Sequence, residues 1–196
     1  MLNRYTSFTK GLPDYMDSQK KLPKVHIGQR NIKTALATTL TAFLYFLVDR
    51  NPTFACIGAI FGMGSDMANS RLNGGNRFFG TLIGGFLGML LFRLYIIFCP
   101  DGGYHFLMLA FIFIGVIILI LISLWCKWPG AIQPGGVVLC IIFFNTPVDT
   151  YISYSLNRII DTGLGVLVAL FINWVFSRDN VDKVLKRKAD ESKTAI

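Results

Sequence analysis

The sequence predicts an all-α membrane protein with six transmembrane helices, arranged as a 3+3 inverted repeat with both termini in the cytoplasm. Three observations carry this prediction: an apolar composition, six apolar segments, and basic residues at both ends. Of the 196 residues, 53% are hydrophobic and only 15% are charged, against about 25% charged in soluble domains. A soluble domain of this length cannot bury so much apolar surface.

Six apolar segments follow one another along the chain. They cover about 32–48, 52–64, 78–98, 106–126, 131–148 and 159–176. The first, third, fourth and sixth have the roughly 17–25 residues that a helix needs to cross the hydrocarbon core. Helix is predicted for them because lipid offers no partner to unpaired backbone groups. The alternation of polarity that a barrel strand needs is missing.

The second and fifth segments differ from the other four. The second has only about 13 apolar residues, which is short for the roughly 30 Å hydrocarbon core, and the fifth is interrupted by prolines and glycines. Short or broken segments at matching positions in two halves point to a transporter binding site. The predicted broken-helix site therefore comprises Asn51, Pro52, Gln133, Pro134 and Gly135. The structural alternative is a merely kinked or tilted helix.

Basic residues define the orientation and the domain boundaries. Thirteen of the 19 Lys and Arg residues lie in residues 1–33 or after residue 177. We expect a basic cytoplasmic segment (1–31), a six-helix transmembrane domain (32–176) and a basic cytoplasmic tail (177–196). A cytoplasmic N-terminus puts 16 basic residues inside and three outside, a strong positive-inside bias. This pattern predicts a multi-pass protein of the bacterial plasma membrane, with its ends against anionic lipid, and not a nucleic-acid binder.

The third and sixth segments begin with the same pattern, N-R-x-x-x-T-x-x-G, 81 residues apart. Its fixed residues are Asn76, Arg77, Thr81 and Gly84, and then Asn157, Arg158, Thr162 and Gly165. Asn51-Pro52 and Gln133-Pro134 are offset by 82 residues, so the two offsets agree. Because each unit has three spans, the second copy of a duplicated unit is inverted in the membrane, as in many transporters.

Arg77 and Arg158 are the main candidates for binding a substrate. The apolar segments predict that each arginine lies at the N-terminal end of a helix, where free N–H groups and the helix dipole favour anions. The repeated neighbours Asn76, Asn157, Thr81 and Thr162 complete the predicted substrate-binding set. The alternative is that both arginine side chains only extend to the membrane interface and bind no substrate. Asp161, one turn after Arg158, is a candidate partner that would mute its charge.

The sequence contains no catalytic or metal-binding pattern. Its four cysteines form no CxxC, it has only two histidines, and no nucleotide-binding motif occurs. No nucleophile and base are suitably spaced. We therefore expect no enzymatic activity, no cofactor and no metal.

These motifs resemble those of the aromatic acid exporter family, within the fusaric acid resistance superfamily. The resemblance covers about 25–178 and is distant to plant aluminium-activated malate transporters. It rests on the run from Ile27 to Leu40, on residues 51–55 (NPTFA), and on the blocks R-x-x-G-T-x-x-G at Arg77 and R-x-x-D-T-x-x-G at Arg158. Longer bacterial members carry a C-terminal cytoplasmic domain, so this chain resembles a short form without it.

The resemblance implies six helices, homo-oligomerisation with a dimer favoured, and export of organic carboxylate anions, aromatic ones among them. In the plant relatives, helix-borne arginines line an anion pore at a dimer, and by motif position Arg77 and Arg158 take that role here. The expected partners are the lipid bilayer and an organic anion. Two alternatives stay open at this point: an anion channel, and a membrane scaffold subunit that transports nothing.

Overall fold

The computed structural model describes residues 28–177, and the regular structure in this part of the chain is helical. The six-helix prediction is confirmed for these residues, whereas most of the two predicted basic tails lies outside them. The elements are α3 (Gln29–Leu47), α4 (Thr53–Gly62), α5 (Met67–Phe98), α6 (Phe106–Trp125), the 3-10 turn η2 (Pro129–Ala131), α7 (Ile132–Asn145) and α8 (Tyr151–Val175).

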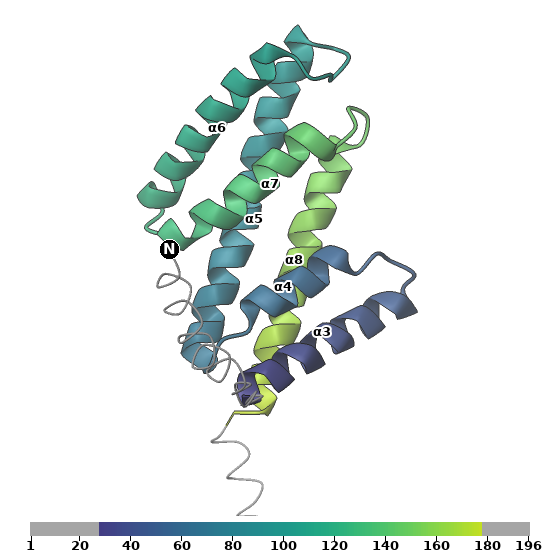
Figure 1. Ribbon diagram of the computed structural model, residues 1–196, viewed down its shortest axis with the longest axis vertical. Coiled ribbons are helices and arrows are strands. Elements are labelled where there is room, and N and C mark those ends of the chain that lie inside the picture. Colours follow the sequence, from purple (N-terminus) through teal and green to yellow (C-terminus); the bar gives the residue numbers. More distant parts are fainter. Residues whose placement is uncertain (1–27, 178–196) are drawn as a thin grey trace, which may run out of the picture.

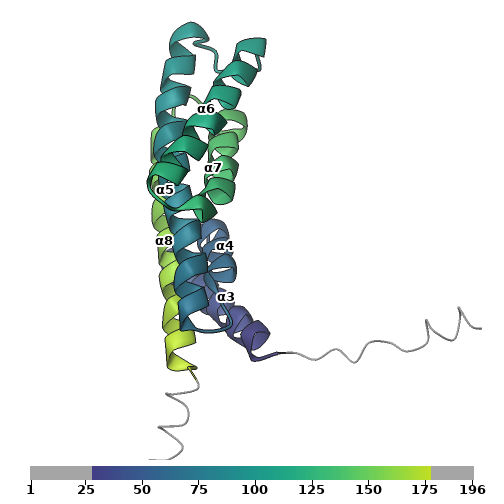
Figure 2. The same cartoon turned by 90° about the vertical axis from the view of Figure 1, so that its left-hand side faces the viewer.

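Two long helices, α5 and α8, lie side by side along the molecule, and the other four flank them (Figure 1). They are antiparallel: in Figure 1, α5 rises while α8 descends. Figure 2 shows α5 and α8 in one layer, with α3, α4 and α7 to one side of it. The most extensive packing joins α4 to α8, α5 to α7, and α5 to α8. The second helix of each half therefore packs on the third helix of the other half.

Small residues allow these helix pairs to approach closely. On the α5–α7 contact, a Cβ added to Gly84 would lie 2.7 Å from the Cα of Gly135. On the α4–α8 contact, a Cβ on Gly58 would lie 2.7 Å from the carbonyl oxygen of Thr162, and one on Gly165 would overlap the carbonyl of Ala55. Backbone thus meets backbone at both contacts, as is common where small residues line helix interfaces in membranes.

Three helices are long and apolar enough to cross a membrane: α5, α6 and α8. The α3 helix has 19 residues but does not belong to this group, because Arg30, Lys33 and several threonines lower its hydropathy. The α4 and α7 helices have 10 and 14 residues, or about 15 and 21 Å. The prediction that segment 52–64 is short is confirmed.

The third and sixth helices begin well before the apolar segments that predicted them. The α5 helix begins at Met67 and α8 at Tyr151, rather than at 78 and 159. Asp66 caps α5 by accepting the N–H of Asn69 at 2.8 Å, and this hydrogen bond lowers the pKa of Asp66. Such a cap satisfies one of the free N–H groups of a helix start, so the polar stretch that follows is helical.

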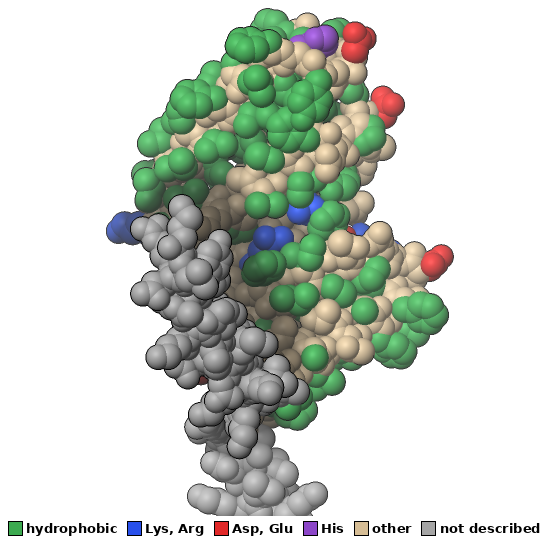
Figure 3. Space-filling model, in the orientation of Figure 1, with side chains coloured by type: hydrophobic (Ala, Val, Ile, Leu, Met, Phe, Trp, Pro, Cys, Tyr) green, Lys and Arg blue, Asp and Glu red, His purple; other side chains and the backbone are tan. Residues whose placement is uncertain are grey.

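Large apolar side chains cover the outside of the helices. Phe106, Phe113 and Trp125 of α6 are each more than two-thirds exposed, and apolar surface dominates the upper half of the molecule in Figure 3. Exposed apolar surface on this scale needs a partner of the same character. Together with the three apolar helices, it identifies a protein embedded in a membrane.

Candidate functional site: a basic cavity between the two halves

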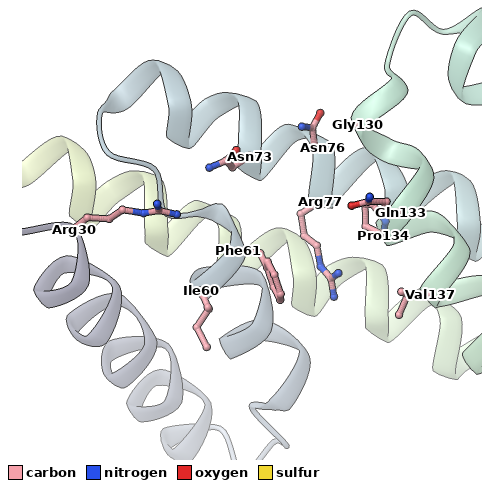
Figure 4. Close-up of a pocket in the computed structure, with 10 residues that line it drawn as sticks. All are labelled: Arg30, Ile60, Phe61, Asn73, Asn76, Arg77, Gly130, Gln133, Pro134 and Val137. Atoms are coloured by element: carbon pink, nitrogen blue, oxygen red, sulfur yellow. The ribbon is translucent and has the colours of Figure 1, made fainter. Parts of the chain in front are cut away.

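A cavity of about 570 Å³ lies where α3, α4, α5 and the start of α7 converge. Its size falls in the range of about 300–1,000 Å³ that is usual for small-molecule sites. Figure 4 shows the ten residues that line it, none of which is acidic. In the space-filling view, basic side chains are visible in the notch between the upper and lower halves (Figure 3).

The guanidinium group of Arg77 lines this cavity. Its side chain extends from α5 between Phe61 of α4 and the α7 helix (Figure 4), and the guanidinium carbon lies 5.3 Å from the centre of the Phe61 ring. Its Nε is buried and has no hydrogen-bond partner among the described residues. A buried charged donor without a partner is costly. The guanidinium of Arg77 therefore has unused hydrogen-bonding capacity at the cavity.

Four further side chains with N–H donors share the cavity with Arg77. They are Arg30, Asn73, Asn76 and Gln133. Arg30 is held by α3 and donates one hydrogen bond, 3.2 Å long, to the carbonyl oxygen of Met63. The Oδ1 of Asn76 accepts the indole N–H of Trp128 at 2.7 Å, which leaves its NH₂ group to donate elsewhere. The donors come from three helices and meet in one space.

The rest of the cavity wall is apolar. Ile60 and Phe61 come from α4, and Pro134 and Val137 from α7. Fixed donors at one side of a pocket and apolar surface at the other match a ligand with a charged end and a hydrophobic body. The Phe61 ring, which already lies near a guanidinium, offers a face for an aromatic body.

Arg158 lies near Arg77 but is enclosed. The side chain is only 3% exposed, its guanidinium carbon lies 3.7 Å from the centre of the Phe54 ring, and Nη1 donates to the hydroxyl of Tyr154 at 3.3 Å. It is close enough for its charge to act on Arg77. Among the described residues, neither Arg77 nor Arg158 has a carboxylate partner.

The predicted helix-end position of the two arginines is wrong. Because α5 and α8 begin at Met67 and Tyr151, Arg77 and Arg158 lie inside the helices, where backbone N–H groups already donate within the helix. The positive charge at this site therefore comes from the guanidinium groups.

Asp161 does not pair with Arg158 in the structure. Its Oδ1 accepts the hydroxyl of Tyr45 at 2.7 Å and Nη2 of Arg50 at 3.0 Å. The Arg50–Asp161 pair is the one salt bridge found within residues 28–177. The predicted ion pair between Asp161 and Arg158 is therefore wrong.

Some of the predicted site residues line the cavity, and the others lie in the helix contacts and connections around it. Asn76, Arg77, Gln133 and Pro134 line the cavity. The remaining residues do not line it: Asn51, Pro52, Thr81, Gly135, Asn157, Arg158 and Thr162. Thr81 and Thr162 are buried in the helix contacts, and the hydroxyl of Thr81 donates to the carbonyl of Arg77 at 2.9 Å.

The supporting residues hold the short helices and α8 in place. Gly135 meets Gly84 at the α5–α7 contact. Pro52 begins α4, and the Oδ1 of Asn51 accepts both the N–H and the hydroxyl of Thr53 at 2.9 and 2.6 Å. Asn157 accepts a hydrogen bond from Arg50 at 3.3 Å.

Sequence reasoning missed Arg30, Phe61 and Asn73. Arg30 falls in the predicted basic N-terminal segment, and Phe61 falls in the second apolar segment without any distinguishing motif. Asn73 falls in a stretch predicted to be a connection. One signal was available: Asn73, Asn76 and Arg77 are spaced i, i+3, i+4, which puts them on one face of a helix. For the fifth segment, the proline and glycines do not break α7, since Pro134 sits in its first turn, where proline is tolerated.

The described part of the chain shows no cluster of three or more His, Cys, Asp or Glu side chains that could hold a metal ion. No curated protein and no solved structure matches the chain. The sequence model described as aromatic acid exporter family member 1 matches residues 25–176. These residues contain all six helices and the whole cavity. The chain therefore belongs to the aromatic acid exporter family.

Proposed function

We propose that this protein exports organic carboxylate anions, aromatic ones among them, through the cavity at Arg77. Membership of the family supports membrane transport. The observation that carries the proposal is the state of Arg77: a half-buried guanidinium whose Nε lacks a partner, in a cavity with no acidic lining residue. A carboxylate would satisfy this group with charge-assisted hydrogen bonds.

The proposed substrate follows from the two walls of the cavity. The donors of Arg30, Asn73, Asn76 and Gln133 surround the anionic end, and Phe61 and Val137 contact the hydrophobic body. Arg158 adds positive potential from behind Phe54. The role of the enclosed Arg158 is then electrostatic in this conformation, because Phe54 separates it from a direct ligand.

We propose a 3+3 inverted repeat as the architecture of the transport domain. The reciprocal packing of α4 on α8 and of α7 on α5 supports it, because a two-fold relation between halves requires each contact to occur twice. We also propose a homodimer. The face of α3 that carries Asn31, Thr34, Thr38 and Thr39 beside a second cavity supports it, because small polar residues are common where helices pack in membranes.

We propose that both termini face the cytoplasm of a bacterial cell and that the chain crosses the plasma membrane six times. Gly28 and Ser177 line one cavity, so the two tails leave the described region at the same end. The three connections at the opposite edge in Figure 1 (α3–α4, α5–α6, α7–α8) contain Asp49, Asp101 and Asp149. The α6–α7 connection contains Lys127. The α3–α4 connection also contains Arg50, but 13 of the 19 basic residues lie in 1–33 or after 177, so this orientation follows the positive-inside rule.

Cysteine labelling tests the orientation. One variant keeps Cys126, which is exposed, as the single cysteine; the other is cysteine-free except for Asp101→Cys. A membrane-impermeant maleimide is expected to label the Asp101→Cys protein in intact cells, and the Cys126 protein only after permeabilisation. Labelling of Cys126 from outside would contradict the proposed orientation.

Anion flux into liposomes tests the proposed function. The purified full chain is reconstituted, and uptake of 4-hydroxybenzoate and of malate is measured at pH 8, where both are ionised. A benzyltrimethylammonium cation, with a similar ring and opposite charge, is the matched control. We expect protein-dependent flux of the carboxylates, saturating with concentration, and none of the cation.

Each result separates two of the functions considered. Flux of the carboxylates alone supports an anion path at Arg77. Equal flux of the cation would contradict a path selected by guanidinium charge. No flux from folded wild-type protein would contradict transport by this chain and favour the scaffold alternative.

A further inference from the structure

One carboxylate lies inside the helices of the described region, one turn from Arg158 on α8. The other acidic residues there, Asp49, Asp66, Asp101 and Asp149, are in connections between helices. Asp161 is in α8 and is 6% exposed. It follows Arg158 by three residues, a spacing that places both on one face of the helix and favours an ion pair. An acid in this position works against anion passage unless its charge is compensated.

Arg50 supplies the compensation from outside α8. It lies in the connection between α3 and α4, and its Nη2 is 3.0 Å from Oδ1 of Asp161. The same nitrogen lies 3.3 Å from Oδ1 of Asn157. Its side chain is 43% exposed while that of Asp161 is 8% exposed, so Arg50 reaches inward from the surface to the acid.

Tyr45 holds the acid from the other side. Its hydroxyl donates to Oδ1 of Asp161 at 2.7 Å, and its ring centre lies 5.9 Å from the guanidinium carbon of Arg50. Arg158 meanwhile contacts Phe54 and Tyr154. Asp161 is therefore bound by Arg50 and Tyr45, and it does not form an ion pair with Arg158.

We propose that Arg50 is a positioning residue for anion transport. It pairs with Asp161, so that Asp161 does not neutralise the charge of Arg158. This inference rests on the proposed function. Loss of the Arg50 charge would leave a buried acid without its cation. The nearest cation on the same helix face is Arg158, so Asp161 would turn to it and cancel the charge that attracts the anion.

Two substitutions break the same ion pair and test this role. Arg50→Gln is expected to lower carboxylate flux by about tenfold, since cancelling one nearby positive charge removes a long-range attraction worth about that factor at an effective dielectric constant of about 20. Asp161→Asn is expected to leave flux at or above the wild-type level, because it removes the competing acid. The double variant Arg50→Gln/Asp161→Asn is expected to recover the flux that Arg50→Gln loses.

A purely structural clasp predicts a different pattern. If the pair only holds α8 to the α3–α4 connection, all three variants lose flux together, and that result would overturn the proposal. Arg50→Lys keeps the charge and is expected to stay within about twofold of wild type, as a long basic side chain can still reach the acid. Arg93→Gln, at an exposed position of α5, is the control for losing one positive charge elsewhere.

The experiment also separates this inference from the proposed function. Wild-type flux with an unaffected Arg50→Gln variant overturns the role of Arg50 and leaves transport intact. A folded wild type that neither passes nor binds 4-hydroxybenzoate, the latter measured by thermal shift in detergent, overturns both.

Discussion

Arg77→Gln is expected to raise the anion concentration at half-maximal flux by about 10- to 100-fold. Hydrogen bonds to a charged group contribute about 1.5–3 kcal/mol, and each 1.4 kcal/mol is a factor of about ten in affinity. Gln keeps a polar side chain in the cavity but removes the charge. The measurement is the concentration dependence of 4-hydroxybenzoate flux in liposomes. Arg77→Lys, a compact cation without the planar fork, is expected to lie in between.

The stability of the Arg77→Gln variant distinguishes a binding arginine from a structural one. Within the described residues, the guanidinium of Arg77 contacts the Phe61 ring, while its buried Nε has no acceptor. Removing such a group relieves desolvation and repulsion from Arg158, so the melting temperature is expected to stay the same or rise. A large fall in melting temperature with unchanged affinity would contradict the binding role. Arg93→Gln again controls for net charge.

Hydropathy predicted the number and order of helices because lipid imposes a simple rule on the chain. Every backbone polar group in the hydrocarbon must be paired within the helix, so long apolar runs such as 106–126 correspond closely to a helix, here α6 (Phe106–Trp125). The same rule says nothing of where a helix continues beyond the apolar run. The starts of α5 and α8 were missed for that reason. The α5 helix extends into a polar stretch with Asp66 capping its first turn, whereas α8 starts without a side-chain cap.

The misplaced helix starts explain the main error about the site. Once 67–77 is helical, Asn73, Asn76 and Arg77 lie on one face of α5, and the proposed anion site moves from a helix end to the helix body. The repeat pattern did single out Arg77, which lines the cavity. The repeat pattern could not show which residues of other helices lie opposite Arg77. Arg30 and Phe61 line the cavity because α3 and α4 pack beside α5, and sequence spacing does not reveal that packing.

The two arginines also show how matching sequence positions acquire different surroundings. Arg77 opens to a cavity beside Phe61, whereas Arg158 is covered by Phe54 at 3.7 Å. Phe54 and Phe61 are seven residues apart on α4, which puts both rings on one face of that helix. One short helix therefore contributes an aromatic ring to each arginine. The position of α4 along α8 decides where these rings lie, so the α4–α8 contact sets the geometry of both arginine–ring contacts.

That contact makes Gly165→Ala the substitution with the largest expected effect on folding. A Cβ on Gly165 would overlap the carbonyl oxygen of Ala55 and lie 2.7 Å from its carbonyl carbon. The colliding atoms are backbone of α4, so no side-chain rotation relieves the overlap, and the two helices must separate. We expect a loss of at least about 3 kcal/mol, the upper end of the usual cost of overpacking, seen as a lower melting temperature and loss of monodisperse protein.

Gly136→Ala is the matched control for this effect. Both glycines lie inside helices, where Ala is favoured over Gly by about 0.5–1 kcal/mol. A Cβ on Gly136 would meet only a methyl group of Leu119, at 3.8 Å, which is an ordinary contact. Gly136→Ala is therefore expected to leave the free energy of unfolding unchanged or to raise it. Gly165→Ala is expected to lower it, because the added Cβ collides with the backbone of α4. Equal melting temperatures for the two variants would show that α4 and α8 do not approach as closely as this fold requires.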